Sequence, residues 1–216
     1  EEFARCIDEI DVLVLAVKPQ ILESLCSQIS NQVSDSLPIL SIAAGYSLNS
    51  FHKAFPETQP IIRCMPNTPG AIGKGITGIL KTDTLTPDHQ SMANTLLSAL
   101  GEVVWVDDEN LMDSITAVSG SGPAYVFYLI EALTKAAIDS GLTEDTATTL
   151  ARQTVIGAAA LADNQTDVPA STLRENVTSP GGTTEAALNI LMDGQFQDAL
   201  TQAVKAATQR GKELSE

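Results

Sequence analysis

The sequence predicts two parts of different fold class: an incomplete, doubly wound α/β sheet over residues 1–107, followed by an all-helical part over residues 108–216. Two observations support this division. Apolar, β-branched runs alternate with helical spacings as far as about residue 107, and beyond it the strand pattern disappears while the apolar helix faces become broad and rich in alanine. Alternating strands and helices with short connections are typical of an open, doubly wound sheet.

In the first part, the run "DVLVLAV" has the continuous apolar character of a strand that is covered on both faces. The expected strands cover residues 11–17, 38–44, 60–66, 76–82 and 102–108. The expected helices between them cover residues 18–30, 47–55 and 86–100. Pro19 suits the first turn of its helix, and Ser47 is placed to cap the next one.

The second part has helical periodicity throughout. A long segment is interrupted by Gly-Ser-Gly-Pro and ends at Gly141, and Thr143 begins the next helix, which runs to about Ala162. The expected helices after it cover residues 169–177, 182–194 and 196–214. Their alanine-rich faces indicate close helix packing and a partner subunit.

Composition excludes several classes of function. The formal net charge is -15 with only 12 Lys and Arg residues, which argues against nucleic acid as a partner. No run reaches the roughly eighteen apolar residues of a membrane span. Cys6, Cys26 and Cys64 show no paired spacing, so we expect reduced, partly buried thiols in a cytoplasmic protein. His52 and His89 lack acidic or cysteine neighbours at ligand spacing, so no metal site is expected.

The stretch "GKGITG" (Gly73 to Gly78) matches the spacing of a dinucleotide-binding glycine loop. That pattern acts only where it follows a strand and opens a helix, because the helix N-terminus holds the pyrophosphate. Here turn-forming residues precede it and a strand pattern follows, so we interpret it as a coincidence of spacing. The chain also begins without Met and reaches a strand almost at once, and we expect its true N-terminus to lie upstream.

Ligands of open α/β sheets bind outside the carboxyl ends of the strands. This rule points to "AVKP" (16–19), "IAAG" (42–45) and "MPNTP" (65–69). Lys18 could meet a ribose or phosphate or could simply be solvated, and the small residues of "IAAG" suit either a flat ring or tight packing.

In the helical part, Gly181 and Gly182 open a helix whose first N–H groups lack intrahelical partners. This stretch is either an anion-binding site or a Ser/Thr cap with a flexible start. "SGSGPAY" (119–125) lacks the residue order of a hydrolase nucleophile turn, and no His lies in a matching context, so a serine hydrolase is not expected.

The segments "VLAVKPQ", "SIAAG", "RCMPNTP", "AVSGSGPAY", "LTEDTATTLARQTVIGAAAL" and "RENVTSPGGTTEAAL" occur in the order and spacing of the Δ1-pyrroline-5-carboxylate reductase family. The resemblance covers essentially the whole chain. It implies a Rossmann-like domain, a helical dimerisation and substrate domain, and homodimers that assemble into decamers. It also implies that the first strand, the true glycine loop and the ribose-reading residues, about fifty positions, precede this span.

The resemblance implies roles for the residues of this chain that match the ligand-binding residues of the family. The cofactor, NADPH with NADH as an option, would meet Ala16, Val17, Lys18, Pro19, Ile42, Ala43, Ala44, Glu109 and Asn176. The substrate would meet Asp167, Val177, Thr183 and Thr184. Thr184 is the candidate catalytic residue, because its hydroxyl would meet the ring nitrogen while backbone N–H groups hold the carboxylate. Asp167 is carried over with a local spacing that differs by about one residue.

The implied reaction is hydride transfer from NAD(P)H to a C=N bond, the last step of proline biosynthesis. A protonated imine accepts hydride readily, so orientation and charge stabilisation suffice and no catalytic His or Lys is needed. Two alternatives stay open. A β-hydroxyacid-type dehydrogenase would need a Lys such as Lys135, which has no Asn four residues later, and a catalytically silent helical oligomerisation scaffold would need no cofactor.

Overall fold

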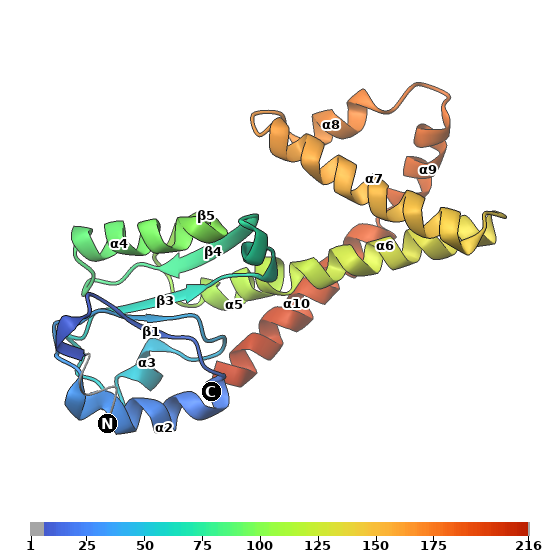
Figure 1. Ribbon diagram of the computed structural model, residues 1–216. Coiled ribbons are helices and arrows are strands. Elements are labelled where there is room, and N and C mark those ends of the chain that lie inside the picture. Colours follow the sequence, from blue (N-terminus) through green and yellow to red (C-terminus); the bar gives the residue numbers. More distant parts are fainter. Residues whose placement is uncertain (1–6, 216) are drawn as a thin grey trace. The chain divides into compact units, whose positions relative to one another are not determined.

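We describe residues 7–215 from a computed structural model of the chain (Figure 1). They form two compact units, which are described separately. The first unit, here the α/β unit, comprises the described residues up to Pro123 together with those from Val204 onward, and the second, the helical unit, comprises Ala124–Ala203. The predicted division at residue 107 lies just after the last strand, and as a boundary between functional domains it stays a prediction.

The α/β unit contains a five-stranded sheet in which each strand neighbours the next along the chain. The strands are β1 (Leu13–Leu15), β2 (Ile39–Ser41), β3 (Ile61–Met65), β4 (Gly75–Leu80) and β5 (Gly101–Val106). All five lie within the predicted ranges or one residue outside them. The sheet is mixed, however, because β4 runs antiparallel to β3 while the other pairs are parallel. Only a short 3-10 helix, η3 (Thr68–Ile72), joins β3 to β4, which is too little chain for a parallel crossover.

Helices cover both faces of this sheet. Successive strand residues point to opposite faces, so Ile39 and Leu40 belong to two different cores, and Ile61 and Ile62 divide in the same way. The longer helices are α2 (Pro19–Ile29) and α4 (Pro87–Leu97). The shorter helical segments are η1 (Ile7–Glu9), η2 (Ser30–Gln32), α3 (Leu48–Phe51), η4 (Ser98–Leu100), α5 (Leu111–Ile115) and a π-helical turn, η5 (Thr116–Gly120).

Predicted helix starts are confirmed at several positions. Pro19 opens α2, and Ser47 Oγ accepts a hydrogen bond from Ser50 N at the start of α3. Thr143 Oγ1 accepts from Thr146 N at the start of the long helix α7. His89, for which we expect no metal-binding role, completes a capping box at the start of α4, since its Nδ1 accepts from Thr86 N.

The helical unit has very little core of its own. Its helices are α6 (Gly122–Asp139), α7 (Glu144–Asn164), α8 (Ala170–Asn176), α9 (Thr183–Leu191) and the first turns of α10 (Gln195–Ser215). Of its described residues, only Ala147 and Ala151 are buried. The large side chains of Tyr128 and Ile190 are 70% and 73% exposed, and a groove of about 590 Å³ between α6 and α10 is lined almost entirely by apolar atoms.

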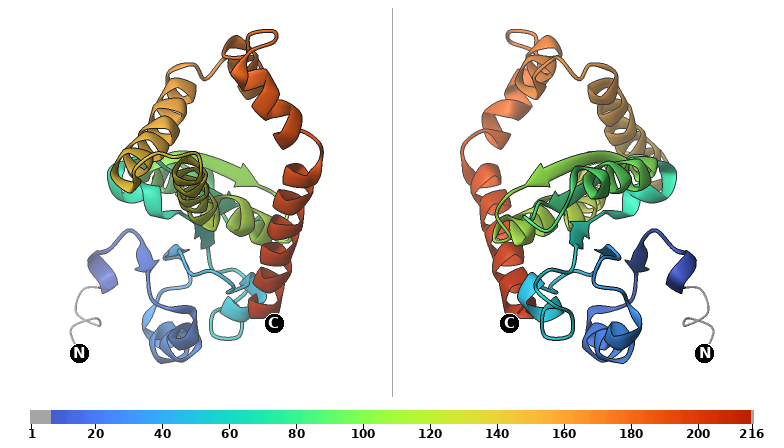
Figure 2. Two further views of the ribbon diagram at one scale, coloured as in Figure 1. Left: turned by 90° about the vertical axis from the view of Figure 1, so that its right-hand side faces the viewer. Right: turned by 90° about the vertical axis from the view of Figure 1, so that its left-hand side faces the viewer.

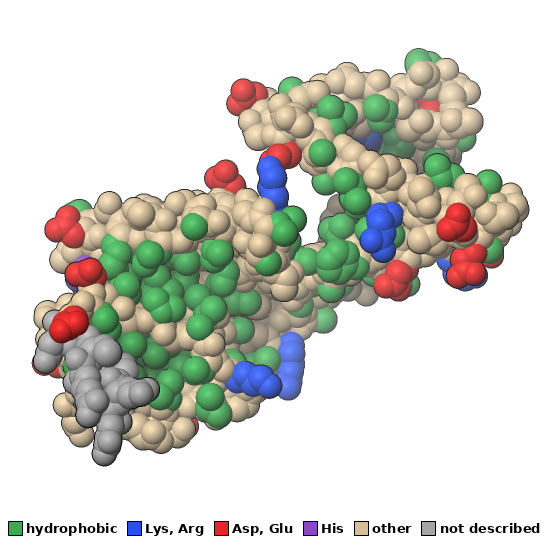
Figure 3. All heavy atoms as spheres, in the orientation of Figure 1, with side chains coloured by type: hydrophobic (Ala, Val, Ile, Leu, Met, Phe, Trp, Pro, Cys, Tyr) green, Lys and Arg blue, Asp and Glu red, His purple; other side chains and the backbone are tan. Residues whose placement is uncertain are grey.

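Figure 3 shows hydrophobic side chains gathered over the α/β unit as well. A hollow of about 430 Å³ lies beside β1 and α2 and is lined by apolar residues, which include Val14 and Leu25, together with Gln28 and Gln32. β1 is the terminal strand of the sheet, so this hollow lies at its edge. None of the described helices is long and apolar enough to cross a membrane.

Candidate functional site

The carboxyl ends of β1 and β2 bring two of the predicted loops together. Ala16 to Lys18 follow β1, and Ile42 to Ala44 follow β2. Ile42 N donates to Leu15 O over 3.3 Å, so the second loop starts against the end of the first strand. Ala16 and Lys18 are exposed, whereas Ala43 is buried. Small side chains and accessible backbone therefore lie side by side where the topology of the sheet favours ligand binding.

The loop after β2 is fixed by contacts along its length. Ser41 Oγ accepts from Ala43 N over 3.3 Å. Gly45 has φ +67°, which only glycine adopts without strain, and a Cβ there would lie 3.2 Å from backbone and side-chain atoms of Leu214. Figure 2 shows the C-terminal end of α10 beside α3, as this contact requires. The C-terminal end of α10 therefore packs against this loop at Gly45.

Glu109 ties the far end of the same loop to the sheet. Its Oε1 accepts from Leu48 N over 2.8 Å, at the first residue of α3, and from Arg63 Nη1 on β3. The Arg63 side chain is only 7% exposed, compared with 33% for Glu109. The carboxylate predicted to reach the cofactor is thus already held by two groups of the α/β unit.

Asn67 connects the "MPNTP" loop to the "SGSGPAY" segment. Its Nδ2 donates to Ser119 O over 3.1 Å, and its Oδ1 accepts from Ile76 N over 3.0 Å. Gly120 allows close contact here as well, since a Cβ would lie 2.9 Å from Met65 Cε. The π-helical turn η5 lies at this junction, and such turns are frequent at functional sites. Both loops were candidates from the sequence, but the hydrogen bonds between them were not predicted.

The "GKGITG" stretch has a structural explanation that excludes a pyrophosphate loop. Gly73 ends η3 with φ +68°, and Gly75 begins the strand β4, so no helix follows. A Cβ on Gly75 would lie 2.7 Å from backbone atoms of Gly70, and one on Gly101 would lie 2.0 Å from Gly75 O. These glycines allow the backbones of η3, β4 and β5 to approach closely, and the interpretation of the motif as a coincidence is confirmed.

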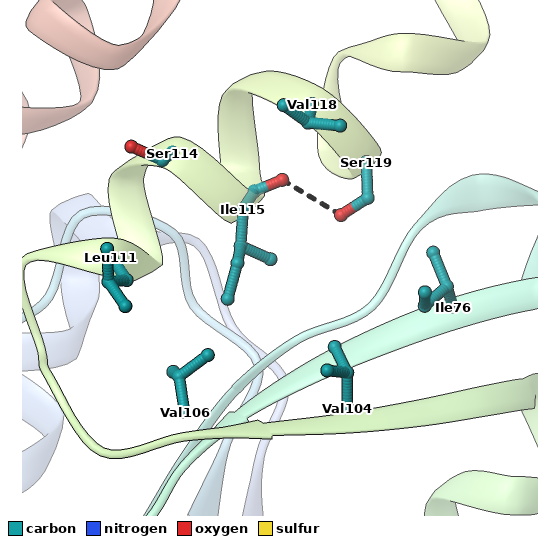
Figure 4. Close-up of a pocket in the computed structure, with 8 residues that line it drawn as sticks. All are labelled: Ile76, Val104, Val106, Leu111, Ser114, Ile115, Val118 and Ser119. Atoms are coloured by element: carbon teal, nitrogen blue, oxygen red, sulfur yellow. Dashed lines mark hydrogen bonds between the residues drawn. The ribbon is translucent and has the colours of Figure 1, made fainter.

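An apolar pocket of about 370 Å³ lies between the outer part of the sheet and α5 (Figure 4). Ile76, Val104 and Val106 point into it from β4 and β5, opposite Leu111 and Ile115 of α5. Its few polar groups include the Ser119 hydroxyl, which donates to Ile115 O over 2.8 Å. The pocket offers no charged group for a phosphate, so it does not suit a dinucleotide.

The predicted substrate residues all belong to the helical unit. Gly182 precedes α9, and the first i to i+4 backbone hydrogen bond of this helix runs from Ala186 N to Gly182 O. The N–H groups of Thr183 and Thr184 come before this bond, in the first turn of the helix. Glu185 Oε2 accepts from Gly181 N over 2.7 Å, and Gly181 has φ +71°. This hydrogen bond stabilises the turn that leads into α9.

The other predicted residues of this unit lie around α8. Asn176 ends α8 and Val177 follows it, and both are exposed. Thr178 Oγ1 donates to Arg174 O over 2.7 Å and so holds the end of this helix. Asp167 lies in the exposed turn between α7 and α8. Thr184 is half-buried and Thr183 is exposed. The structure thus places every predicted site residue on a helix end or a loop.

The cysteines are structural. Cys26 and Cys64 are free thiols, as predicted, but they are fully buried in the two cores and not partly buried, and Cys6 lies outside the described residues. Burial raises the pKa of Cys64 to about 12 and also raises the pKa of Cys26. Both thiols therefore stay protonated near neutral pH and are poor nucleophiles. Among the described residues, no cluster of His, Cys, Asp or Glu could hold a metal ion.

The residues predicted to meet the nicotinamide follow β1 and β2. The alanines among them have small side chains, and Lys18 is an exposed cation at the start of α2. Val17 and Pro19 are half-buried and shape this loop.

Comparisons with known proteins agree with this geometry. A family model described as pyrroline-5-carboxylate reductase dimerisation matches residues 109–214. The pyrroline-5-carboxylate reductase of Pseudomonas aeruginosa is 41% identical over 216 residues, which cover all of this chain and 79% of that protein.

Two solved structures show the same fold. The structure of a pyrroline-5-carboxylate reductase from Coxiella burnetii matches with a TM-score of 0.91 and 40% identity, over 98% of this chain and 78% of that one. The Plasmodium falciparum pyrroline carboxylate reductase, solved with NADP bound, matches with a TM-score of 0.84 and 31% identity, over 100% of this chain and 80% of that one. On this identity, coverage and shared fold, the chain belongs to the pyrroline-5-carboxylate reductase family.

Proposed function

We propose that this chain catalyses the reduction of 1-pyrroline-5-carboxylate to L-proline, with NADPH, or alternatively NADH, as the hydride donor. The observation that carries the proposal is the likeness to reductases of this name along the whole chain. The loops at the ends of β1 and β2 and the glycine turn before α9 support it, because they supply the donors and the space that the reaction needs.

The cofactor side of the proposed site lies in the α/β unit. Ala16 to Pro19 contact the nicotinamide ribose and pyrophosphate, and Ile42 to Ala44 form the wall behind the ring. Glu109 belongs to this side because its carboxylate holds the residue that starts α3. Asn176, at the end of α8, is assigned to cofactor binding on the family resemblance alone. When bound, the cofactor supplies the hydride.

The substrate side consists of residues from the helical unit. The amides of Thr183 and Thr184 hold the carboxylate of the substrate at the positive end of α9. The Thr184 hydroxyl bonds to the ring nitrogen and orients the C=N bond. Val177 and Asp167 complete the pocket. Because the imine is protonated before hydride arrives, these residues orient it and stabilise charge without acting as a strong acid.

The protein acts as a homo-oligomer. The exposed apolar faces of α6, α9 and α10 support a dimer through the helical unit, since surfaces of this kind mark protein interfaces. We further propose that the dimers assemble into a decamer and that the enzyme works in the cytoplasm.

The test is an assay of NADPH oxidation that depends on pyrroline-5-carboxylate, with proline measured as product. We expect proline to form in proportion to the NADPH consumed. A β-hydroxyacid-type dehydrogenase would instead oxidise a hydroxyacid, and in that case Lys135 would be required. Lys135 is exposed and pairs with Asp139 over 3.3 Å, which does not favour this alternative. A full-length protein that neither binds NADPH nor reduces the imine would be a scaffold, and the proposal would be wrong.

A further inference from the structure

Arg63 has an unusual environment for a charged residue. It lies in the middle of β3, and it is the only charged side chain that is buried among the residues that the structure describes. Its Nη1 donates to Glu109 Oε1, which accepts from Leu48 N as well. One carboxylate oxygen therefore joins β3, the turn after β5 and the start of α3.

Stability alone does not explain this arrangement. Removing a guanidinium from water costs several kcal/mol, and the ion pair regains that energy only with good geometry. An apolar pair of similar volume would often be equally stable or more so. An ion pair fixes the direction and the distance between the elements that it joins, and an apolar pair does not.

One end of the loop over residues 42–48 is paired with β3 through the backbone, and the other end is linked to the Arg63 side chain through Glu109. At one end, Ser41 lies opposite Arg63 in the parallel ladder of β2 and β3. At the other end, Leu48 N is held by the same carboxylate that Arg63 pairs with. The loop contains Ile42 to Ala44, which form the proposed wall behind the nicotinamide.

We propose that Arg63 is a positioning residue for the nicotinamide end of the cofactor. The strand ladder fixes the first end of this loop, and the Arg63 side chain fixes the second end through Glu109, which sets the position of the wall. It acts through these neighbours and does not itself contact the cofactor or the substrate. The inference rests on the proposed function, because it needs a nicotinamide bound at this loop.

The main experiment separates positioning from stability. The double variant Arg63→Met with Glu109→Leu removes both charges and the bond to Leu48 N, while it keeps similar side-chain volumes. We expect its melting temperature to recover most of what the single variant Arg63→Met loses. We expect the dissociation constant for NADPH, measured by calorimetric titration, to be raised by at least about tenfold in Arg63→Met, which leaves the Glu109 carboxylate in place, and to stay raised in the double variant. Tenfold is equivalent to about 1.4 kcal/mol.

The matched control is the exposed pair of Lys81 and Asp107, whose charged atoms lie 3.9 Å apart in the same unit. Lys81→Met with Asp107→Asn should change neither the melting temperature nor NADPH affinity. The contrary outcome is that NADPH affinity follows the melting temperature, so that the double variant regains both the affinity and the melting temperature that Arg63→Met loses. In that case the pair has only a structural role and the inference is wrong.

A second variant keeps the test decisive if the apolar variants do not fold. Glu109→Asp retains the charge but is one methylene shorter, so it cannot reach Leu48 N and Arg63 together. We expect it to fold and to bind NADPH several-fold more weakly, and unchanged affinity would overturn the inference. Failure of the proposed function is recognised separately, because the wild-type protein would then show no NADPH oxidation with pyrroline-5-carboxylate, and both proposals would be withdrawn.

Discussion

The side-chain amide of Asn67 joins two loops that lie 52 residues apart in the sequence, because its Nδ2 donates to Ser119 O over 3.1 Å. Its Oδ1 accepts from Ile76 N as well. One side chain thus fixes the end of β3, the start of β4 and the π-helical turn before α6. An asparagine suits this place because its amide is both donor and acceptor.

Replacing Asn67 by Ala should lower the free energy of unfolding by about 1 to 3 kcal/mol, since two hydrogen bonds of about 0.5 to 1.5 kcal/mol each are lost. Urea unfolding would measure it. Asn94→Ala is the control, because Asn94 Oδ1 accepts only an exposed bond from Trp105 Nε1. Equal losses in the two variants would contradict a structural role for Asn67.

Gly73 and Gly75 should respond differently to replacement by Ala, although both lie in the same glycine pattern. A Cβ on Gly73 would lie 4.0 Å from Ala99 O and would have space, so its cost is that of the left-handed backbone, about 1 to 2 kcal/mol. A Cβ on Gly75 would collide with the backbone of Gly70, and we expect a loss of about 3 kcal/mol or more.

Thermal unfolding would show this difference. In folded Gly73→Ala protein, NADPH affinity should stay unchanged. A rise of tenfold or more in its dissociation constant, about 1.4 kcal/mol, with an unaltered melting profile would mean that the stretch is a phosphate loop after all.

Thr184→Ala should reduce the turnover of pyrroline-5-carboxylate, whereas Thr184→Ser should retain much of it. The difference is one hydroxyl hydrogen bond, worth about 0.5 to 1.5 kcal/mol, or roughly twofold to tenfold in rate. Steady-state kinetics would measure it. Thr201→Ala is the control, because that hydroxyl bonds to Gln197 O within its own helix. Equal activity of the wild type and Thr184→Ala would refute the assigned role.

Stability should fall as the pH rises above 9, partly because of Cys64. Burial raises its pKa from 9.0 to about 12, so the folded protein favours the neutral thiol. The unfolded chain releases this proton first, and the contribution, complete below pH 9, is lost as the pH rises from 9 towards 12. Cys64→Ala should therefore show a weaker fall in unfolding free energy between pH 9 and 11.

Val33→Ala is the control for this measurement, because it shortens a buried side chain that does not titrate. It should lower stability at every pH without changing the slope. A slope for Cys64→Ala equal to that of the wild type would show that Cys64 does not contribute. Tyr46, whose pKa is also raised to about 12 mainly by burial, accounts for part of the remaining slope.

Local patterns were enough to predict the strands and most of the helix starts. Pro19, Ser47 and Thr143 act on the backbone within a few residues, so the structure confirms them where the sequence places them. The antiparallel direction of β4 was not predicted. It depends on the length of the connection after β3, and "MPNTPGAIGK" carries no pattern of period 2 or 3.6 that would reveal it.

The contacts that organise the site could not be predicted, because they join distant residues. Arg63 meets Glu109 across 46 positions and Asn67 meets Ser119 across 52. A signal for the first pair was nevertheless present: a single Arg within the apolar run "PIIRCMP" must find an acceptor when that strand is buried. The predicted ligand residues came from family resemblance, and their roles stay predictions.

The absence of any buried residue in α6 has a consequence for the thermodynamics of the whole protein. A helix that cannot bury its apolar face within its own chain gains that burial only when another subunit covers it. Folding of the helical unit and association then become one equilibrium, governed by mass action. The midpoint of thermal unfolding should rise with protein concentration, and the amount of the protein present in a cell becomes one of the quantities that determine how much of it is folded.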